Sequence, residues 1–435
     1  LLVPKEKLKG DAKVHFAVYE NRGLPYIEWD GGAAGNLEEE LGRCDVIVDA
    51  MLGTGVKGAV REPFQTAIRI VNRLRDKLVI AVDVPSGVNS DDGTVDGVAV
   101  KADKTITFVF PKKGFFLKDG PKYVGEWKAV PISVPPSIAD QLNLGLPEVI
   151  TEELAKACVP VRTPSGHKGT FGHALVIGGS EPYVGAPVFT AKAAFHCGAG
   201  LVTLAVSENI YPIAAAQNPE SLYMPLPEAD GHFAPGKTKK IVASLEKFDA
   251  VAIGPGMGRF QGGDKWLKDI VFALNGQPVV IDADALYLLR KELKSLRKIA
   301  GPVIMTPHPG EMAHLIQKTV PEVEGNRLEV AREFAVQYGV YLLLKGHRSV
   351  IAAPDGKIFI CPHGHDALGK GGSGDILTGM IVSFLAQGAD PAEALVAASF
   401  LHARAGERKS AELSRYGVTP LHLIDAVKEQ LNEWM

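Results

Sequence analysis

Short apolar runs alternate with amphipathic segments along most of this chain, and that alternation limits the possible folds more than any other feature. Residues 44–52 (CDVIVDAML) are rich in β-branched side chains, and residues 61–76 (REPFQTAIRIVNRLRD) place their apolar positions at helical spacing. A second apolar run follows at residues 77–87 (KLVIAVDVPSG). Strand, helix and strand at this spacing are typical of βαβ units, so the sequence predicts an α/β fold with parallel sheets.

The length of the chain and one proline-rich segment together predict two domains. A chain of 435 residues is too long for one ordinary hydrophobic core. Residues 130–149 (VPISVPPSIADQLNLGLPEV) are weakly periodic and are typical of a linker. We therefore expect one domain over residues 1–145 and a second over 155–435, where the alternation restarts. The strands expected in the second domain lie within residues 173–179, 200–206, 249–256, 277–286, 302–308 and 340–346.

Composition narrows the class of protein. The net charge of −3 argues against a general nucleic-acid surface. No run approaches the roughly 18 apolar residues that a membrane span needs, so we expect no nucleic-acid partner and no membrane. The four cysteines lie far apart in the sequence, which favours free thiols in a reducing compartment and a cytoplasmic protein.

Polar residues and glycines follow several of the expected strands of the second domain. In open parallel sheets, ligands bind beyond the carboxyl ends of the strands, where such residues would gather. Each one alone is as well explained by a turn, a helix cap or a surface charge, but together at one sheet edge they predict a single site. These residues are Gly254, Gly256, Gly258, Asp282, Asp284, His308, Glu311 and Lys345.

The segment GKGGSGD (369–375) directly precedes an apolar helical run. Its glycines expose several backbone N–H groups at the positive end of a helix dipole, which suits a phosphate or a transferring phosphoryl group. Asp375 is then placed to take the proton of an attacking hydroxyl, although it also fits the simpler role of a helix cap. Lys345 could counter phosphate charge, and His308 could hydrogen-bond a substrate. The chain has no Walker motif, so it is not a P-loop enzyme.

Several motifs in order along the chain carry a specific resemblance. GHKGTFGHALVIGGS, AIGPGMG, VVIDADAL, TPHPGEMAHLI, LLKGHRSVI and GGSGDILTGMI resemble the ADP-dependent NAD(P)H-hydrate dehydratases, a branch of the ribokinase-like fold, over about residues 160–430. CDVIVDAMLGTGVKG, AVDVPSGVNSDDG and ADKTITFVFPKKG resemble the NAD(P)H-hydrate epimerase domain that is often fused ahead of it. The resemblance implies a Rossmann-like three-layer domain followed by a ribokinase-like one.

This resemblance implies a bifunctional repair enzyme for hydrated NAD(P)H. The epimerase domain would interconvert the R and S hydrates, and the dehydratase domain would consume the S form at the expense of ADP, with ATP left open. The nucleotide would phosphorylate the ring hydroxyl, and loss of phosphate would restore the double bond. Mg²⁺ is expected with the transferred phosphate, K⁺ is implied in the epimerase domain, and the family tends to form homo-oligomers.

The same resemblance assigns roles to individual residues. Hydrate contacts in the dehydratase domain would fall on Ala186, Gly258, His308 and the catalytic Asp375. Nucleotide contacts would fall on Lys345, Gly346, His347, Arg348, Ser349 and Gly374. In the epimerase domain the hydrate would contact Gly53, Thr54, Gly55, Val56, Lys57, Gly58, Ala59 and Asp83, and K⁺ would be bound by Asp49 and Ser86.

Two departures from the family pattern qualify these expectations. The chain opens at LLVPKEKLKGDAKVHF, after the position where an asparagine- and glycine-rich GNNGGDG-like loop should stand, so we expect an N-terminally incomplete epimerase domain or a fragment. Where the family has something close to GNPGLATGGSGD, this chain has GHDALGKGGSGD. A metal site at His363, His365 and Asp366 is disfavoured against a solvated loop, and Lys370 would add charge beside the phosphate.

Three other functions stay open at this point. GTGVKG (53–58) is a GxGxxG sequence after a strand, but a dehydrogenase would have an acid about 20 residues further on, and Asp83 lies beyond that distance. A ribokinase-like kinase for a vitamin precursor alcohol would share the glycine loop and Asp375. A nucleotide-binding sensor would keep the fold without needing a base.

Overall fold

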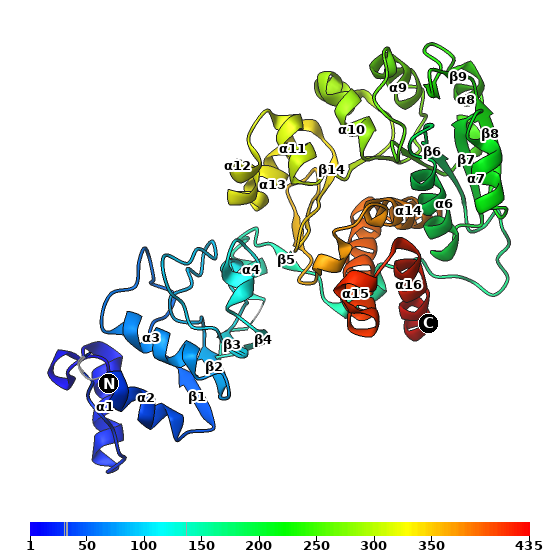
Figure 1. The fold of residues 1–435 in the computed structure, drawn as a ribbon. Helices are drawn as coiled ribbons and strands as arrows, with labels where there is room; N and C mark the ends of the chain where they lie inside the picture. Colours follow the sequence, from blue (N-terminus) through cyan, green and yellow to red (C-terminus); the bar gives the residue numbers. More distant parts are fainter. Residues whose placement is uncertain (30, 32–33, 136) are drawn as a thin grey trace. The chain divides into compact units, whose positions relative to one another are not determined.

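The computed structural model describes residues 1–29, 31, 34–135 and 137–435. The chain divides into two compact units, Leu1–Gly145 and Leu146–Met435 (Figure 1). Each unit is built around its own sheet, and each is described here by itself. Among the described residues, no helix combines the length and the apolar character needed to cross a bilayer.

The first unit contains a four-stranded parallel sheet in the order β1-β2-β3-β4. Buried and exposed residues alternate along β1, and Ile47 packs with Ile68 of helix α3 and with Val79 and Ala81 of β2. This is the strand–helix–strand unit that the sequence predicts. The bounds are α1 Gly10–Asn21, α2 Ala34–Gly42, β1 Val46–Asp49, α3 Phe64–Arg73, β2 Leu78–Val82, β3 Lys104–Phe108, β4 Glu126–Val130 and α4 Ile138–Gln141.

The second unit is organised by a ten-stranded sheet in the order β5-β16-β15-β14-β13-β12-β11-β6-β7-β8. The strands from β14 to β8 are parallel, and every residue of β11, β12 and β13 is buried, as in a sheet covered on both faces. The bounds are β5 Glu148–Val149, β6 His173–Ile177, β7 Leu201–Ser207, β8 Leu222–Leu226, β11 Ala250–Ile253, β12 Val279–Ile281, β13 Val303–Met305, β14 Tyr341–Leu344, β15 Val350–Ala352 and β16 Ile358–Ile360, with the short pair β9 Glu228–Ala229 and β10 His232–Phe233 outside it.

The six strands expected in this unit are all present, and the structure adds four to the sheet. β15 and β16 continue from β14 as antiparallel strands, and β5 pairs in parallel with β16 at the edge. Glu148–Val149 lies in the segment interpreted as a linker, so the sheet of the second unit includes residues before position 155. A two-residue strand carries no periodic signal, and only its pairing partner reveals it.

Helix α14 is the central helix of the second unit. Nearly all of its residues are buried, and it packs against α6, α15 and the strands β6, β11 and β12 (Figure 1). This packing fixes the start of α14 at the strand ends. The helix bounds are α5 Glu152–Ala157, α6 Gly185–His196, α7 Tyr211–Gln217, α8 Lys239–Val242, α9 Gly263–Val271, α10 Asp284–Leu289, α11 Pro309–Ile316, α12 Val320–Gly325, α13 Arg327–Tyr338, α14 Ser373–Ala386, α15 Pro391–Gly417 and α16 Pro420–Trp434.

Candidate functional site

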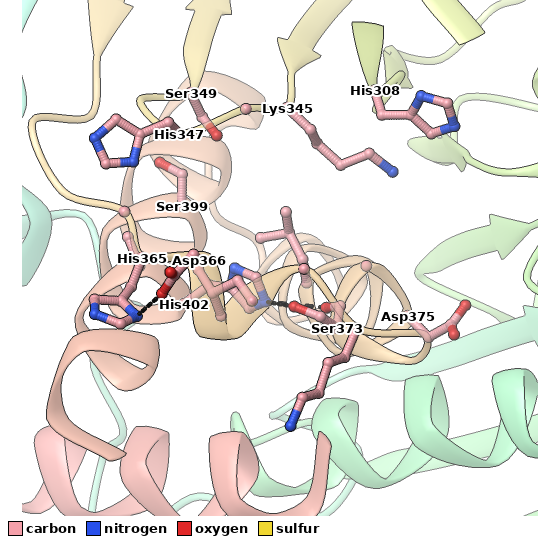
Figure 2. Close-up of a pocket in the computed structure, with 18 of the residues that line it drawn as sticks. His308, Lys345, His347, Ser349, His365, Asp366, Ser373, Asp375, Ser399 and His402 are labelled. Atoms are coloured by element: carbon pink, nitrogen blue, oxygen red, sulfur yellow. Dashed lines mark hydrogen bonds and ion pairs between the residues drawn. The ribbon is translucent and has the colours of Figure 1, made fainter. Parts of the chain in front are cut away.

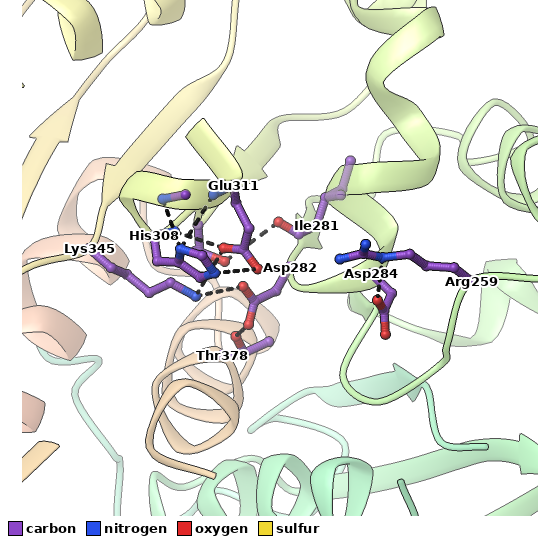
Figure 3. Close-up of polar contacts among 10 residues, drawn as sticks. Arg259, Ile281, Asp282, Asp284, His308, Glu311, Lys345 and Thr378 are labelled. Carbon is purple, nitrogen blue, oxygen red and sulfur yellow. Dashed lines mark hydrogen bonds and ion pairs between the residues drawn. The ribbon is translucent and has the colours of Figure 1, made fainter. Parts of the chain in front are cut away.

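The site is assembled at the carboxyl ends of three neighbouring strands of the large sheet. Asp282 follows β12, His308 follows β13 by three residues, and Lys345 follows β14. Parallel pairing of these strands brings the three side chains to one edge, as the sequence predicts. Figure 3 shows them converging with Thr378, which comes from α14.

A buried ionic network holds this edge together. The Nζ of Lys345 lies 2.9 Å from Oδ1 of Asp282, and the Thr378 hydroxyl donates to Oδ2 of Asp282 at 2.6 Å. The same ammonium lies 3.8 Å from Oε2 of Glu311 on α11. Asp282 therefore joins a residue after β14 to the second turn of α14, and its carboxylate is almost fully shielded from solvent.

The charges in this network stabilise one another. Burial by itself would raise the pKa of Asp282, but the Lys345 ammonium and the Thr378 hydroxyl outweigh it, and the pKa is lowered. Burial would lower the pKa of Lys345, yet the carboxylates of Asp282 and Glu311 raise it. Lys345 is therefore a cation and Asp282 an anion at neutral pH.

The glycine loop precedes α14 and leaves backbone donors free for a ligand. Gly372 is the N-cap residue of α14, has φ +97°, and carries no side chain that caps the helix. Among the described residues, the N–H groups of Gly374 and Asp375 have no hydrogen-bond acceptor. A Cβ on Gly374 would stand 3.6 Å from Nζ of Lys345, so the free donors and the ammonium lie side by side. Together they form a cradle for an anion.

Asp375 has the properties of a general base. Burial raises the pKa of its carboxyl, the nearby Asp282 carboxylate raises it further, and Lys345 lowers it, for a net pKa of about 7. A base whose pKa lies near the operating pH is both partly ionised and strong enough to take a proton from a hydroxyl. A surface helix cap would not show this shift.

A cavity of about 790 Å³ opens in front of this cradle. That volume suits a nucleotide-sized ligand. His308, Lys345, His347, Ser349 and Asp375 line it, together with the backbone of Gly346 and Gly374. Figure 2 shows Lys345 and Asp375 on the side of the cavity nearest His308, with His347 and Ser349 across from Ser373.

A second cavity, of about 410 Å³, lies on the other side of the loop. Ala186 and Gly185 of α6, Gly256 and Asp284 line it, and it shares Gly371, Gly372 and Asp375 with the first cavity. Asp375 therefore borders both cavities. A phosphoryl donor bound in one cavity and a phosphoryl acceptor bound in the other would meet at the Asp375 carboxylate.

One functional residue lies outside the motifs that the sequence analysis identifies. His402, in the middle of α15, places Nε2 3.0 Å from both the hydroxyl and the carbonyl oxygen of Ser373, the first residue of α14 (Figure 2). Burial lowers the pKa of His402 to about 4, so the ring is neutral and can donate only one of these hydrogen bonds at a time. His402 ties the glycine loop to α15, and a histidine inside an apolar helix gave no signal of this.

The unusual residues before the loop have structural partners. The ammonium of Lys370 lies within 2.6 Å of the carbonyl oxygens of Tyr416 and Val418. Lys370 also lines the cavity of about 790 Å³, so its added charge at the phosphate stays a prediction. His363 faces Glu407 at 3.2 Å, and His365 contacts Asp366. Among the described residues, no three histidine, cysteine or acidic side chains form a group that could hold a metal ion.

In the first unit, Asp49 at the end of β1 is joined directly to Ser86, in the loop that follows β2. The Ser86 hydroxyl and backbone N–H donate to the two carboxylate oxygens of Asp49, at 2.6 and 2.8 Å. Asp49 is buried, no basic side chain contacts it among the described residues, and burial raises its pKa. A buried carboxylate of this kind, next to a hydroxyl oxygen, is a suitable ligand set for a hard cation.

The other epimerase-type residues flank this pair. Asp83 follows β2 with φ +66° and accepts bonds from Lys112, Thr107 and the Phe108 N–H, which together hold its pKa low against burial. Residues 53–59 form an irregular loop after β1. Helix α3 begins only at Phe64, so these glycines do not open a helix as a dinucleotide fingerprint requires.

Comparison with known proteins identifies the family. A model described as NAD(P)H-hydrate dehydratase matches residues 174–429, and one described as YjeF-related protein N-terminus matches residues 1–114. The bifunctional NAD(P)H-hydrate repair enzyme Nnr of Moorella thermoacetica is 34% identical over 98% of this chain and 80% of its own length. The chain belongs to this repair family. The enzyme of the same name from Thermofilum pendens is also 34% identical, over 99% of this chain and 81% of its own.

Solved structures confirm the ribokinase-like fold of the second unit. The ADP/ATP-dependent NAD(P)H-hydrate dehydratase of Bacillus subtilis, co-crystallised with ATP and Mg²⁺, is 35% identical, with a TM-score of 0.58 over 66% of this chain and 99% of its own. A ribokinase-like protein from Enterococcus faecalis is 25% identical with the same TM-score, over 66% of this chain and 96% of its own. The α/β class and the family expected from the sequence are thus confirmed.

The contacts expected for a member of the repair family are not all at the two cavities. Arg348 does not line the cavity of about 790 Å³, and burial lowers its pKa to about 10. Gly258 does not line the second cavity; its N–H donates to Asp284 at 3.0 Å, and a Cβ there would collide with the ring of His232. Ala186, His308 and Asp375 do lie at the cavities.

Proposed function

We propose that the second unit dehydrates the S form of hydrated NAD(P)H, using ADP or ATP to phosphorylate the ring hydroxyl before phosphate is lost. The observation that carries this proposal is the position of Asp375, which borders both cavities and has a pKa of about 7. The nucleotide would occupy the larger cavity, and the hydrated ring would enter the smaller one beside Ala186. Family membership supplies the substrate class.

The first chemical step follows from the geometry. The ring hydroxyl gives its proton to Asp375, and its oxygen attacks the terminal phosphoryl group of the nucleotide as the bond to the leaving phosphate oxygen breaks. The N–H groups of Gly374 and Asp375 and the ammonium of Lys345 face the negative charge that develops on the phosphoryl oxygens. They are oriented before the reaction, so they stabilise this charge with little rearrangement.

The second step restores the double bond. Phosphate is a better leaving group than hydroxide, so the C–O bond breaks with its electron pair on phosphate as the neighbouring ring carbon releases a proton to solvent. The products are NAD(P)H, inorganic phosphate and the nucleotide shortened by one phosphate. His308 is exposed at the cavity of about 790 Å³, where it is available to hydrogen-bond the substrate during this step.

Mg²⁺ fits this site as an ion carried by the nucleotide. It would neutralise charge on the transferred phosphoryl group. The Asp282 carboxylate is already committed to Lys345 and Thr378, so the protein offers little direct coordination there. We therefore infer that Mg²⁺ is held chiefly by phosphate oxygens and water.

For the first unit we propose epimerisation of the R and S hydrates, with K⁺ held by Asp49 and Ser86. Among the described residues no basic side chain contacts the buried Asp49 carboxylate, which supports a bound cation. The hydrate would then contact the loop 53–59 and Asp83, which follow β1 and β2 at the same edge of the small sheet.

Three buried free thiols support a cytoplasmic location for the protein. The proposal of a homo-oligomer rests on the family resemblance alone.

The test is recovery of NADH from its hydrate by the purified chain. S-hydrate would be mixed with Mg²⁺ and with ADP, ATP or no nucleotide, and absorbance of NADH followed. We expect NADH with at least one nucleotide and none without it. Adding R-hydrate tests the first unit: consumption of R-hydrate above the spontaneous rate supports epimerisation. Absence of NADH with both nucleotides would refute the proposed function of the second unit.

A further inference from the structure

A third cavity, of about 260 Å³, shares His308 with the cavity of about 790 Å³, and nothing in the proposed chemistry occupies it. We propose that it binds the adenosine end of the hydrated dinucleotide, with Arg259 contacting the ribose 2′-phosphate that distinguishes NADPH from NADH. The proposal rests on the proposed function, because it extends the same substrate. It predicts a preference for NADPH hydrate.

One shared residue and one ion pair link the third cavity to the reacting centre. His308 lines both the third cavity and the cavity of about 790 Å³. Asp284 lines the cavity of about 410 Å³, as Asp375 does. Its Oδ1 lies 3.1 Å from Nε of Arg259, which lines the third cavity. Figure 3 shows Arg259 and Asp284 on the far side of Asp282 from Lys345. A dinucleotide whose hydrated ring reaches Asp375 is too large for the cavity of about 410 Å³ alone. Its remaining part could extend past the Arg259–Asp284 pair into the third cavity.

The side chains of this cavity suit an aromatic base. The guanidinium carbon of Arg259 lies 4.0 Å from the ring centroid of Tyr287, and the ring of His314 stacks on Tyr287 at 4.2 Å with an interplanar angle of 12°. The guanidinium and the imidazole cover the two faces of the Tyr287 ring, so a base would stack on the outer face of one of these two groups. Arginine and aromatic rings arranged in this way are typical partners for a nucleobase.

The same cavity suits a phosphate group. Only Nε of Arg259 has a hydrogen-bond partner among the described residues, which leaves its two terminal nitrogens for a ligand. Burial and the nearby Arg290 and Arg259 lower the pKa of His314, so the positive charge of the cavity lining comes from Arg259, with Glu311 as its acidic member. Arginine binds phosphate through two parallel hydrogen bonds, and it accommodates the 2′-phosphate in NADP-binding proteins.

The decisive comparison is the affinity of each variant for the two hydrates, measured without a phosphoryl donor. Equilibrium binding of S-NADPH hydrate and S-NADH hydrate would be measured for the wild type, Arg259→Gln, Arg259→Lys and Lys294→Gln, which removes an exposed charge outside the cavity. We expect the wild type to bind NADPH hydrate about tenfold more tightly, the gain of one charge-assisted bond. Arg259→Gln should lose that preference, Arg259→Lys should keep part of it, and Lys294→Gln all of it.

Turnover separates this inference from the proposed function. If the chain forms no NAD(P)H, the proposed function fails, while the binding measurement still tests the subsite. Equal affinity of the wild type for both hydrates, or a preference that survives in Arg259→Gln, would overturn the subsite whether or not turnover occurs. A second variant, Tyr287→Leu, removes the stack and should weaken binding of both hydrates by similar factors; no change for either would contradict the placement of the base.

Discussion

Lys345 and Asp282 meet across the edge of the large sheet, with Nζ 2.9 Å from Oδ1, although 63 residues separate them in the chain. One strand, β13, lies between the strands that carry them. Because Thr378 donates to the other oxygen of the same carboxylate, the pair fixes the position of α14 relative to β12 and β14. Asp375 lies three residues before Thr378, so this contact also orients the base.

Removing one partner of this pair should destabilise the fold far more than removing the hydroxyl that supports it. Asp282→Asn leaves the buried Lys345 ammonium without its nearest carboxylate, which typically costs about 3–5 kcal/mol. Thr378→Val removes one hydrogen bond to a charged group at nearly constant shape and should cost about 1.5–3 kcal/mol. Urea unfolding monitored by circular dichroism measures both. Equal, small losses would show that Glu311 alone suffices to hold Lys345.

The dehydration rate should depend on the ionisation of Asp375. The carboxyl takes up a proton only when ionised, and its pKa is about 7. Accordingly kcat/KM should rise with pH and level off above about pH 7, and Asp375→Asn should lower kcat at least about 100-fold at every pH. A steady-state profile from pH 5 to 9 measures this. A flat profile would show that another group takes the proton.

The raised pKa of Asp375 also predicts a change in stability: the ionised carboxylate that activity needs lowers the free energy of unfolding. Because the folded pKa of Asp375 is raised above its unfolded value, the native state binds more protons, and ionising this carboxyl destabilises the fold as pH rises towards 7. Asp375→Asn should therefore unfold with a higher free energy than the wild type at pH 8, by at most about 4 kcal/mol. The difference should shrink towards pH 5. A variant less stable than the wild type at pH 8 would contradict this.

Two glycines of the loop should respond differently to alanine. At Gly372, φ is +97° and a Cβ would stand 2.5 Å from Pro420 Cγ, so Gly372→Ala should cost at least about 1–2 kcal/mol. At Gly374 the nearest atom is Nζ of Lys345 at 3.6 Å, so Gly374→Ala should fold with an unchanged or higher Tm and raise the KM for the nucleotide. Thermal unfolding and initial rates compare the two. An unchanged nucleotide KM in Gly374→Ala would place the phosphates elsewhere.

Potassium should stabilise the first unit through Asp49. A cation that binds only the native state raises the unfolding temperature. We expect a higher Tm for the first unit in KCl than in choline chloride of equal ionic strength, and Asp49→Asn should abolish the difference. Lys104→Gln, an exposed substitution on the neighbouring β3, serves as the control and should preserve the difference. Equal Tm values in the two salts would argue against the potassium site.

The sequence predicts the strands of the second unit well because a parallel sheet covered on both faces selects continuous apolar, β-branched runs. β12 and β13 are of this kind. β5 is missed, since two residues have no period and only their pairing with β16 makes them a strand. The turn between the antiparallel strands β15 and β16 could have been predicted. Residues 354–356 read PDG, which is typical of a tight turn.

At the site, the sequence predicts which loops matter more reliably than where each side chain points. Asp282, His308 and Lys345 could be placed together because all three follow parallel strands. The contact of His402 with Ser373 could not be predicted, because it depends on how α15 packs against the start of α14. The contacts of the Lys370 ammonium with the carbonyl oxygens of Tyr416 and Val418, at the end of α15, could not be predicted either.

The central claim is that phosphate is transferred to the hydrate and then released, which separates a dehydratase from a kinase with the same glycine loop. The most direct test measures inorganic phosphate and NADH in one reaction of the purified chain with S-hydrate, Mg²⁺ and the active nucleotide. We predict one phosphate released for each NADH formed, with both absent in Asp375→Asn. A phosphorylated product that retains its phosphate, with no NADH formed, would contradict the account.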